Sequence, residues 1–437
     1  MVLEGLTLPE ITDVDPGAEG ESGLDPLGLS AVAEDLVDLL TSEHLTARMQ
    51  RVRFLTAIAA CAAVLNHVDV DLRGDTEPQL AFEWLVVQAM AQAALPQEAT
   101  RSVPGIGKAR AARLRGEMLD ARSYLKVPAV FGFHGVYKRL ARGLRIVDKQ
   151  LLLDEVGYSL LHEWERDAPS TRAGFADAAG GTPGGDLNRS LQGAVRRALE
   201  RGGIAESAQV HLWRKLADAF RPDGAGRREA TLLWEALIDL SPQVAELLGH
   251  LDSHPPNFAV ESELDVLADL RATVSVDLRR RVDTVAAYER LASLLYRPFQ
   301  AVQWEATVNG TVPVPLVNAA DLPTVAHARA EVDHAVEAAA TACSGVDPAM
   351  PERVAEIADR FVGTPDAAAF VDALLGRHRA VQDVRDKQPW FDELAAGLVL
   401  RTPYRLEEEP PGPEAVQVHP VRIVGLASFR ADLKGRA

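Results

Sequence analysis

The sequence predicts a mainly α-helical protein of several domains with a small C-terminal α/β region. The chain has 437 residues, which is enough for two or three domains at about 150 residues each. Apolar residues recur at helical spacing over most of the chain, in segments that Pro and Gly separate. Runs with the alternating pattern of a β-strand are short and lie late in the chain.

These patterns divide the chain into six segments. Residues 1–28 are acidic and rich in Gly and Pro, so a disordered tail is expected there. The glycines of Gly180–Gly185 favour a linker. The expected order is an acidic tail at 1–28, an N-terminal helical region at 29–100, a basic segment at 101–170, a Gly-rich linker at 171–190, a helical domain at 191–345 and a C-terminal α/β region at 346–437.

Individual elements follow from periodicity and from turn residues. A first helix is expected from Leu29. Ala306–Val317 alternates Val residues around Asn309-Gly310, which predicts a β-hairpin. Gly397–Tyr404 and Val416–Ala427 also resemble strands. Further helices are predicted near 44–67, 76–95, 191–201, 206–220, 227–248, 260–295, 324–343, 351–361 and 366–386.

The charges are unevenly distributed along the chain. With 46 Lys plus Arg and 63 Asp plus Glu, the net charge is −17, which argues against a protein coated in nucleic acid. Residues 101–150, however, contain twelve Lys or Arg and three acids, a net charge of +9, so the rest carries −26. This basic segment predicts a localised anion-binding activity.

Composition also limits location and metal content. The chain has no Lys or Arg before Arg48, so neither a signal nor a transit peptide is expected. No apolar run reaches the roughly 18 residues of a membrane span. Cys61 and Cys343 cannot form a disulfide framework or a four-cysteine zinc site. A cytoplasmic protein without a membrane segment is predicted.

The first half of the basic segment contains a turn motif. Val103–Gly107 reads Val-Pro-Gly-Ile-Gly, with Ala111 and Leu114 following, and resembles the helix-hairpin-helix family. In that family the glycines permit a tight turn, and the amides of the next helix bind a phosphate. A helix–helix turn with solvated arginines is the alternative. The resemblance implies backbone-phosphate contacts from Gly105, Gly107, Lys108, Arg110 and Arg113.

The second half resembles the end of a winged helix. His134–Val147 is predicted as a helix, Ile146–Leu152 as two strands around a tight turn, and Gly157, Leu160 and Leu161 as the start of a closing helix. In winged-helix regulators the basic helix enters the DNA major groove. The alternative is a small helical subdomain with a solvated basic face. The predicted DNA-facing stripe comprises Lys138, Arg142, Arg145 and Lys149, with Arg139 beside it.

Aromatic residues are interleaved with these basic residues. Tyr124 and Tyr137 are placed where they can stack on bases, whereas Phe131 and Phe133 flank Gly132 and are expected in the core.

Other constellations give no clear catalytic or metal site. Gly180–Gly185 lacks the Gly-Lys-Ser/Thr ending of a phosphate-binding loop. Neither His250 with His254 nor His327 with His334 and Cys343 has metal-ligand spacing with a third ligand nearby. The face formed by His378, Gln382, Arg385 and Lys387 is expected to be solvated, with Trp390 anchoring its end. No metal and no cofactor are predicted.

The leading functional hypothesis is non-enzymatic binding of duplex DNA, dominated by backbone contacts, through residues 101–165. The acidic helical remainder then binds protein partners or a second copy as a homo-oligomer. Such a protein suits an accessory subunit of a larger bacterial DNA-handling or phage-defence assembly. The alternative is a helical scaffold whose basic segment docks an acidic protein, and a third hypothesis is an enzyme with an unfamiliar site.

Overall fold

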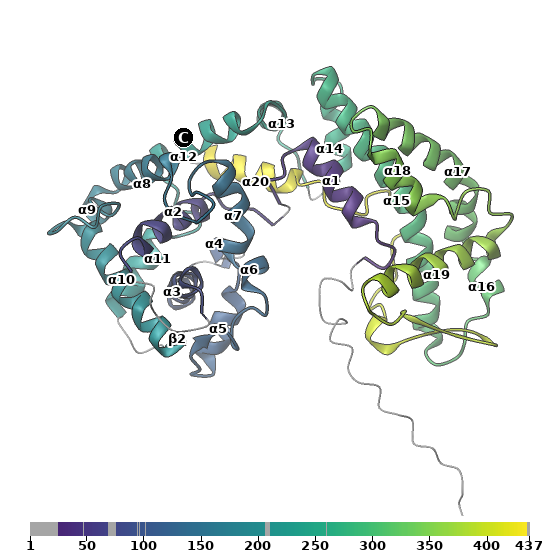
Figure 1. The fold of residues 1–437 in the computed structure, drawn as a ribbon, viewed down its shortest axis with the longest axis horizontal. Coiled ribbons are helices and arrows are strands. Elements are labelled where there is room, and N and C mark those ends of the chain that lie inside the picture. Colours follow the sequence, from purple (N-terminus) through teal and green to yellow (C-terminus); the bar gives the residue numbers. More distant parts are fainter. Residues whose placement is uncertain are drawn as a thin grey trace, which may run out of the picture. The chain divides into compact units, whose positions relative to one another are not determined.

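The fold is mainly helical. The computed structural model describes residues 25–434, except residues 47, 69–75, 94, 96, 101, 206–209 and 259. Within this described part, helices account for most of the regular structure, and the strands form two short antiparallel pairs (Figure 1). The predicted fold class, mainly α with a small strand-containing region near the C-terminus, is therefore confirmed.

The chain folds into two compact units. Unit 1 combines the described residues up to Leu36 with Ser275–His419, and unit 2 combines Val37–Val274 with the residues from Pro420. Each unit joins segments that are far apart in the sequence. The units therefore do not follow the contiguous boundaries that composition predicts.

Unit 2 is a helical assembly around two buried helices. Nearly every residue of α2 (Arg53–Leu65) and the segment 81–91 of α3 (Pro78–Gln92) is buried, so these helices form the core that the others enclose (Figure 1). Strand β1 (Leu119–Asp120) pairs antiparallel with β2 (Gly203–Ile204). The other helices are α4 (Gln97–Thr100), α5 (Ile106–Leu114), α6 (Pro128–Phe131), α7 (Phe133–Gly143), α8 (Glu155–Asp167), α9 (Pro169–Arg172), α10 (Pro183–Arg201), α11 (Val210–Ala219), α12 (Arg227–Leu240), α13 (Pro242–Ser253), α14 (Glu263–Leu270) and α20 (Ile423–Lys434).

A buried ion pair lies in the core of unit 2. Arg53 Nη1 is 3.0 Å from Glu229 Oε2, and both side chains are fully buried. The Thr56 hydroxyl also donates to Glu229, and Arg53 donates to the carbonyl of Gly224. These partners offset the high cost of burying two charges.

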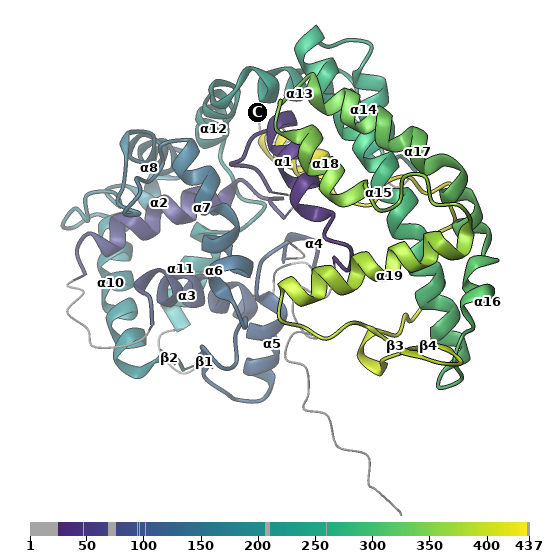
Figure 2. The same ribbon diagram turned by 45° about the vertical axis from the view of Figure 1, so that its right-hand side comes forward.

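Unit 1 is built on the long helix α15 (Val276–Asn309), which packs against α17 (Pro323–Ser344). Figure 2 shows the β3–β4 hairpin below α19, and Phe391 pairs with Leu400 in its register. The remaining elements are α16 (Leu316–Ala320), α18 (Met350–Ala358), α19 (Ala367–Val384), β3 (Phe391–Leu394), β4 (Gly397–Leu400) and the 3-10 turn η2 (Thr402–Tyr404). Helix α1 (Ser30–Leu40) begins in unit 1 and ends in unit 2.

Two predicted β-segments are wrong. Most of Ala306–Val317 forms the end of α15 and a loop, because Asn309 ends the helix and Gly310 adopts the positive φ of a helix C-terminus. Val314 alone forms a β-bridge, to Leu398. Within Val416–Ala427, the residues from Ile423 belong to α20.

The segment predicted as a linker is packed. Gly184 and Gly185 lie in the first turn of α10, where both are buried. A Cβ at Gly184 would lie 1.9 Å from the Arg172 carbonyl oxygen, and one at Gly185 would lie 1.9 Å from the carbonyl of Ala179. These glycines permit close contact between chain segments rather than flexibility.

The predicted tail and the predicted polar face of α19 also need correction. Residues 1–24 lie outside the described residues, but Leu27 is fully buried and Asp25 accepts hydrogen bonds from the amides of Leu29 and Ser30. His378 is 1% exposed, with Nδ1 2.9 Å from the Pro26 carbonyl oxygen and Nε2 accepting from the Trp390 amide. Burial lowers the pKa of His378 to about 4, so this residue is a neutral core side chain.

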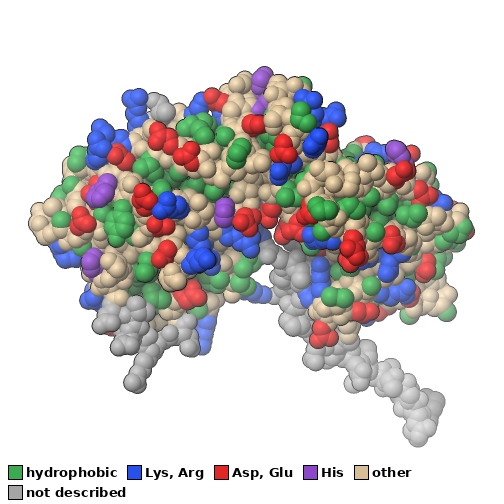
Figure 3. All heavy atoms as spheres, turned by 45° about the horizontal axis from the view of Figure 1, so that its top comes forward, with side chains coloured by type: hydrophobic (Ala, Val, Ile, Leu, Met, Phe, Trp, Pro, Cys, Tyr) green, Lys and Arg blue, Asp and Glu red, His purple; other side chains and the backbone are tan. Residues whose placement is uncertain are grey.

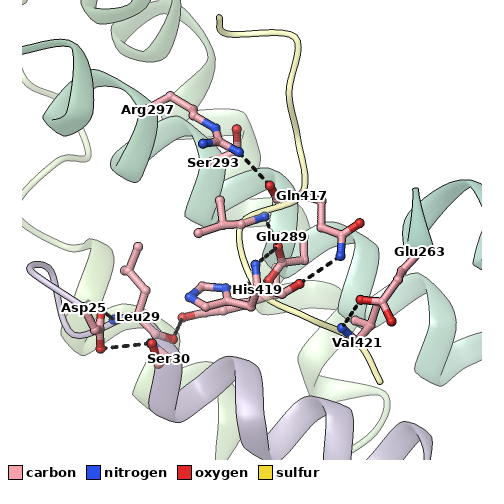
Figure 4. A network of polar contacts seen from close by, with 12 residues as sticks. Asp25, Leu29, Ser30, Glu263, Glu289, Ser293, Arg297, Gln417, His419 and Val421 are labelled. Carbon is pink, nitrogen blue, oxygen red and sulfur yellow. Dashed lines mark hydrogen bonds and ion pairs between the residues drawn. The ribbon is translucent and has the colours of Figure 1, made fainter. Parts of the chain in front are cut away.

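An extended segment, residues 415–419, is held against α15 and is here named the C-terminal strap (Figure 4). The buried carboxylate of Glu289 accepts from the amides of Val418 and His419 at 2.6 and 2.9 Å, and lies 2.7 Å from His419 Nδ1. Arg297 donates to the carbonyl oxygen of Gln417 at 2.7 Å. Farther along, in unit 2, Glu263 accepts from the amide of Val421 at 2.8 Å. Side chains thus satisfy the polar backbone of this segment where no strand pairs with it.

Candidate nucleic-acid interface

The predicted helix-hairpin-helix turn joins α4, which is a single turn long, to α5. Gly105 adopts φ +74°, and a Cβ at this position would lie 2.2 Å from Tyr124 Cε2. Gly105 is therefore required by the left-handed backbone and by the packing of Tyr124. Gly107 is exposed and has open space around it, and no side chain caps α5 at Gly105.

One residue of the hairpin pattern departs from the expected packing. Ala109 and Ala112 form the buried face of α5, whereas Leu114, the aliphatic residue of the motif, is 88% exposed. The structure therefore forms the glycine turn without burying that residue. The helix-hairpin-helix resemblance stays a prediction.

A buried carboxylate from α3 organises both halves of the basic segment. Glu83 is 1% exposed, and its Oε1 accepts a 2.8 Å hydrogen bond from the Tyr124 hydroxyl. That hydroxyl also lies 3.3 Å from the carbonyl oxygen of Pro104 in the hairpin turn. Glu83 Oε2 accepts from the amide of His134 at 3.0 Å, at the start of α7. Burial, followed by the charge of Glu83, raises the pKa of Tyr124 well above its usual value.

Glu83 was not predicted from the sequence because it lies about 20 residues before the basic segment, inside a strongly apolar helix. One signal was present. A charged residue among ten other buried residues of α3 requires a polar partner. Gly132 supports the same arrangement, because a Cβ there would lie 2.1 Å from Glu83 Oε1.

Helix α7 is shorter than the predicted His134–Val147. It ends at Gly143, and Arg145 adopts a left-handed φ of +57° just beyond it. Lys138 and Arg142 therefore lie on the helix, whereas Arg145 and Lys149 lie in the connection to α8. The predicted continuous stripe of four basic residues is broken at the helix end.

The segment after α7 forms a tight turn. Val147 and Leu153 form a single antiparallel bridge, and Asp148 Oδ1 accepts from the amides of Gln150 and Leu152 at 2.9 Å each. Arg142 closes the turn by donating to the carbonyl oxygen of Lys149 at 2.7 Å. The order helix, turn, helix agrees with the prediction, but the flanking residues form a bridge rather than two strands.

Several basic residues of α5, α7 and the turn after α7 form no ion pair with a carboxylate that the structure describes. Arg145 pairs with Glu155 at 2.7 Å, and both side chains are well exposed. Arg113 is exposed and donates to the Ala91 carbonyl oxygen, while Arg110 donates to the Thr100 hydroxyl. Six cations form no ion pair with any carboxylate of the described residues: Lys108, Arg110, Lys138, Arg139, Arg142 and Lys149.

The aromatic residues of the segment are mostly part of the core. Tyr124, Phe133 and Tyr137 are at most 3% exposed, so the suggested base stacking by the two tyrosines is wrong. The predicted core position of Phe133 is confirmed. Phe131 is half-buried, and the guanidinium of Arg48 lies 4.4 Å from its ring centre.

Elsewhere, charges of both signs are mixed. On the face that Figure 3 shows, Lys and Arg side chains are interspersed with Asp and Glu. His250 and His254 stack with ring centres 4.8 Å apart, and His250 Nδ1 lies 3.1 Å from the Thr273 hydroxyl. The described ranges contain no group of three or more His, Cys, Asp or Glu side chains placed to hold a metal ion.

Comparisons of the chain with protein-family models, with curated proteins and with solved structures each found no match. Among the helices within 25–434 that the structure describes, none has the length and hydropathy to cross a membrane. The functional interpretation therefore depends on the residues and their geometry alone.

Proposed function

We propose that this protein binds duplex DNA through the surface formed by α5, α7 and the turn after α7. The observation that carries the proposal is the set of six cations on this surface that have no carboxylate partner among the described residues. Lys and Arg side chains without such a partner attract the phosphate backbone without regard to sequence. Such a surface supports binding, and its described residues form no arrangement that indicates catalysis.

A shared buried partner, Glu83, connects the hairpin segment and α7 to one framework. Glu83 bonds Tyr124, which contacts the hairpin turn, and also bonds the first turn of α7. Lys108 on α5 and Arg139 on α7 are both exposed, whereas the opposite faces of these two helices are buried. Rigid elements position charged groups with less loss of side-chain entropy on binding than mobile loops do.

The salt dependence of binding tests the proposal. Six phosphate contacts predict a slope of log K against log salt of roughly −5, because each contact contributes about −0.9. Lys108→Ala and Arg139→Ala should each make the slope shallower by about one unit. Fluorescence anisotropy of a labelled duplex with the full chain measures both values.

Arg214→Ala with Lys215→Ala provides a matched control. Both residues are exposed on α11, away from the proposed surface. This control removes two positive charges, as does the double variant that combines Lys108→Ala with Arg139→Ala, and the two are compared directly. The control should keep the wild-type slope. Equal slopes for the two double variants, or no duplex affinity at about 50 mM salt, would reject the proposal.

A further inference from the structure

A patch of apolar side chains is exposed at one end of unit 1, outside the surface assigned to DNA. It is formed by the end of α15, the turn after it, the start of α16 and the tip of the β3–β4 hairpin, and Figure 2 shows α16 and the hairpin close together at this end. Five large apolar side chains of these elements are 46–65% exposed. They are Val308, Val312, Leu316, Val317 and Leu394, and they are here named the uncharged patch.

Backbone contacts join the hairpin to the segment before α16. Val314 exchanges two hydrogen bonds of 2.8 Å with Leu398 on β4. A Cβ at Gly397 would lie 2.2 Å from the carbonyl oxygen of Val314, and Leu394 is the cross-strand partner of Gly397. The tip of the hairpin and the segment around Val314 therefore belong to one continuous surface.

The chain around the patch carries no charge. Residues 306–320 contain no Asp, Glu, Lys or Arg, although 25% of all residues in the chain are charged. The other two uncharged stretches of at least fourteen residues, 54–68 and 84–97, lie mainly in the buried helices α2 and α3, where burial excludes charge. Within 306–320, four large apolar side chains are instead exposed, so burial inside the fold does not account for this composition.

We propose that the uncharged patch is the contact face of a homodimer, in which it packs against the same patch of a second copy. A two-fold interface places one surface against itself, so a patch with charges of one sign would repel its own copy. The chain carries a net charge of −17, which makes two copies repel each other over most of their surfaces. An apolar patch without charge avoids this repulsion, and its removal from water favours association.

Side chains make this contact, because the backbone of the segment cannot extend the sheet. Pro313 and Pro315 flank Val314 and have no N–H to donate from the outer edge. The five side chains of the patch present on the order of 200–300 Å² of apolar surface per copy. A standard interface buries about 800 Å² per partner, so a weak, reversible dimer with a dissociation constant of roughly 10–100 µM is expected.

Sedimentation equilibrium of the full chain from about 1 to 300 µM tests the dimer, because this range spans the expected dissociation constant. The average mass should rise from that of a monomer toward twice that value. Hydrogen-exchange mass spectrometry at the two ends of the range should show slower exchange at high concentration in peptides that cover 306–320. A monomer at every concentration, or protection that leaves 306–320 unchanged, would overturn the proposal.

Variants locate the contact face. Val312→Asp places two like charges opposite each other across the two-fold axis and should weaken the dimer about tenfold or more. Val317→Asp should do the same, and its fold is secure because an acid is favourable in the first turn of α16. Val384→Asp is the matched control, since Val384 is 89% exposed at the end of α19 in the same unit, and it should dimerise as wild type.

Equal weakening by Val384→Asp would assign the effect to added charge anywhere on the chain and reject the patch. Wild-type dimerisation of both patch variants would reject it as well. The dimer does not rest on DNA binding, since no residue of the α5–α7 surface belongs to the patch.

Discussion

Gly105 and Gly107 lie two residues apart in the hairpin, and their structural settings predict opposite effects of the same substitution. Gly105→Ala places a side chain at φ +74°, which costs about 1–2 kcal/mol. The new Cβ would lie 2.3 Å from the Tyr124 hydroxyl oxygen, so Tyr124 must move and give up its hydrogen bond to Glu83. An unsatisfied buried partner adds about 1–3 kcal/mol. The expected loss is therefore roughly 2–5 kcal/mol.

Gly107→Ala is the matched control. Gly107 has ordinary helical φ, and a methyl group added there would have no other atom within 4 Å, so alanine should stabilise α5 by about 0.5–1 kcal/mol. Guanidinium unfolding followed by Trp fluorescence measures both changes, and hydrogen exchange of α3 and α5 peptides assigns them to unit 2. If Gly105→Ala proves as stable as Gly107→Ala, the structural role given to Gly105 is refuted.

Three further predictions concern buried polar groups. Glu229→Gln should cost about 3–5 kcal/mol in guanidinium unfolding, because it leaves the Arg53 charge unpaired in the core. Glu117→Gln, in an exposed ion pair with Arg115, should cost at most about 1 kcal/mol, and similar losses for the two variants would contradict the assigned burial. His378 has a pKa of about 4 in the folded protein against 6.5 for an unperturbed histidine, so the unfolded chain binds the proton first and stability should fall by about 3 kcal/mol as the pH drops from 6.5 to 4. A pH series of unfolding should show this loss, and His378→Phe should flatten it; an unchanged slope in the variant would assign the loss to other groups. Glu289→Gln should weaken the acceptor for two amides of the C-terminal strap, and hydrogen-exchange mass spectrometry should show faster exchange of these amides, with unchanged protection ruling out the proposed anchoring.

Helical periodicity predicted the fold class because it reports local burial on one face of a helix. The helix predicted at 366–386 is α19, Ala367–Val384, and that predicted at 324–343 is α17, Pro323–Ser344. Breaks within predicted helices were harder to locate. The segment 227–248 divides at Ser241, whose side chain caps α13 after α12 ends at Leu240. Pro242 at the first position of α13 marks this break in the sequence.

The wrong predictions arose where one residue pattern serves two structures. An Asn-Gly pair is typical of a hairpin turn and also of the end of a helix. In this chain Asn309 and Gly310 end the long helix α15. Clustered glycines mark flexible linkers and also close contacts, as at Gly184 and Gly185. The segment before α20 was predicted as a strand, but the carboxylates of Glu289 and Glu263 bind its amides where a neighbouring strand would otherwise do so. Such partners, more than 100 residues away, leave no local signal.

The sequence predicted the charged residues of the candidate interface, but not the buried contacts that hold its helices in place. Exposed Lys and Arg follow from helical spacing, because the opposite face of α7 is apolar. The burial of Tyr124 and Tyr137 depends on partners outside the segment. Tyr137 illustrates this, since its hydroxyl accepts from the amides of Gln50 and Arg51 at 2.9 Å each, and burial raises its pKa to about 12.

The distribution of charge limits how the proposed interface can work. Residues 101–150 carry +9 and the rest of the chain carries −26, so repulsion from the acidic remainder favours DNA on the α5–α7 surface alone. Non-specific contacts of this kind give dissociation constants of about 10⁻⁴–10⁻⁶ M at physiological salt. Tighter occupancy of DNA therefore requires a second contribution, either base contacts from α7 or a partner protein that adds its own DNA contacts. Because phosphate contacts alone set the salt slope, a partner would steepen it, whereas base contacts would raise affinity for one sequence at an unchanged slope.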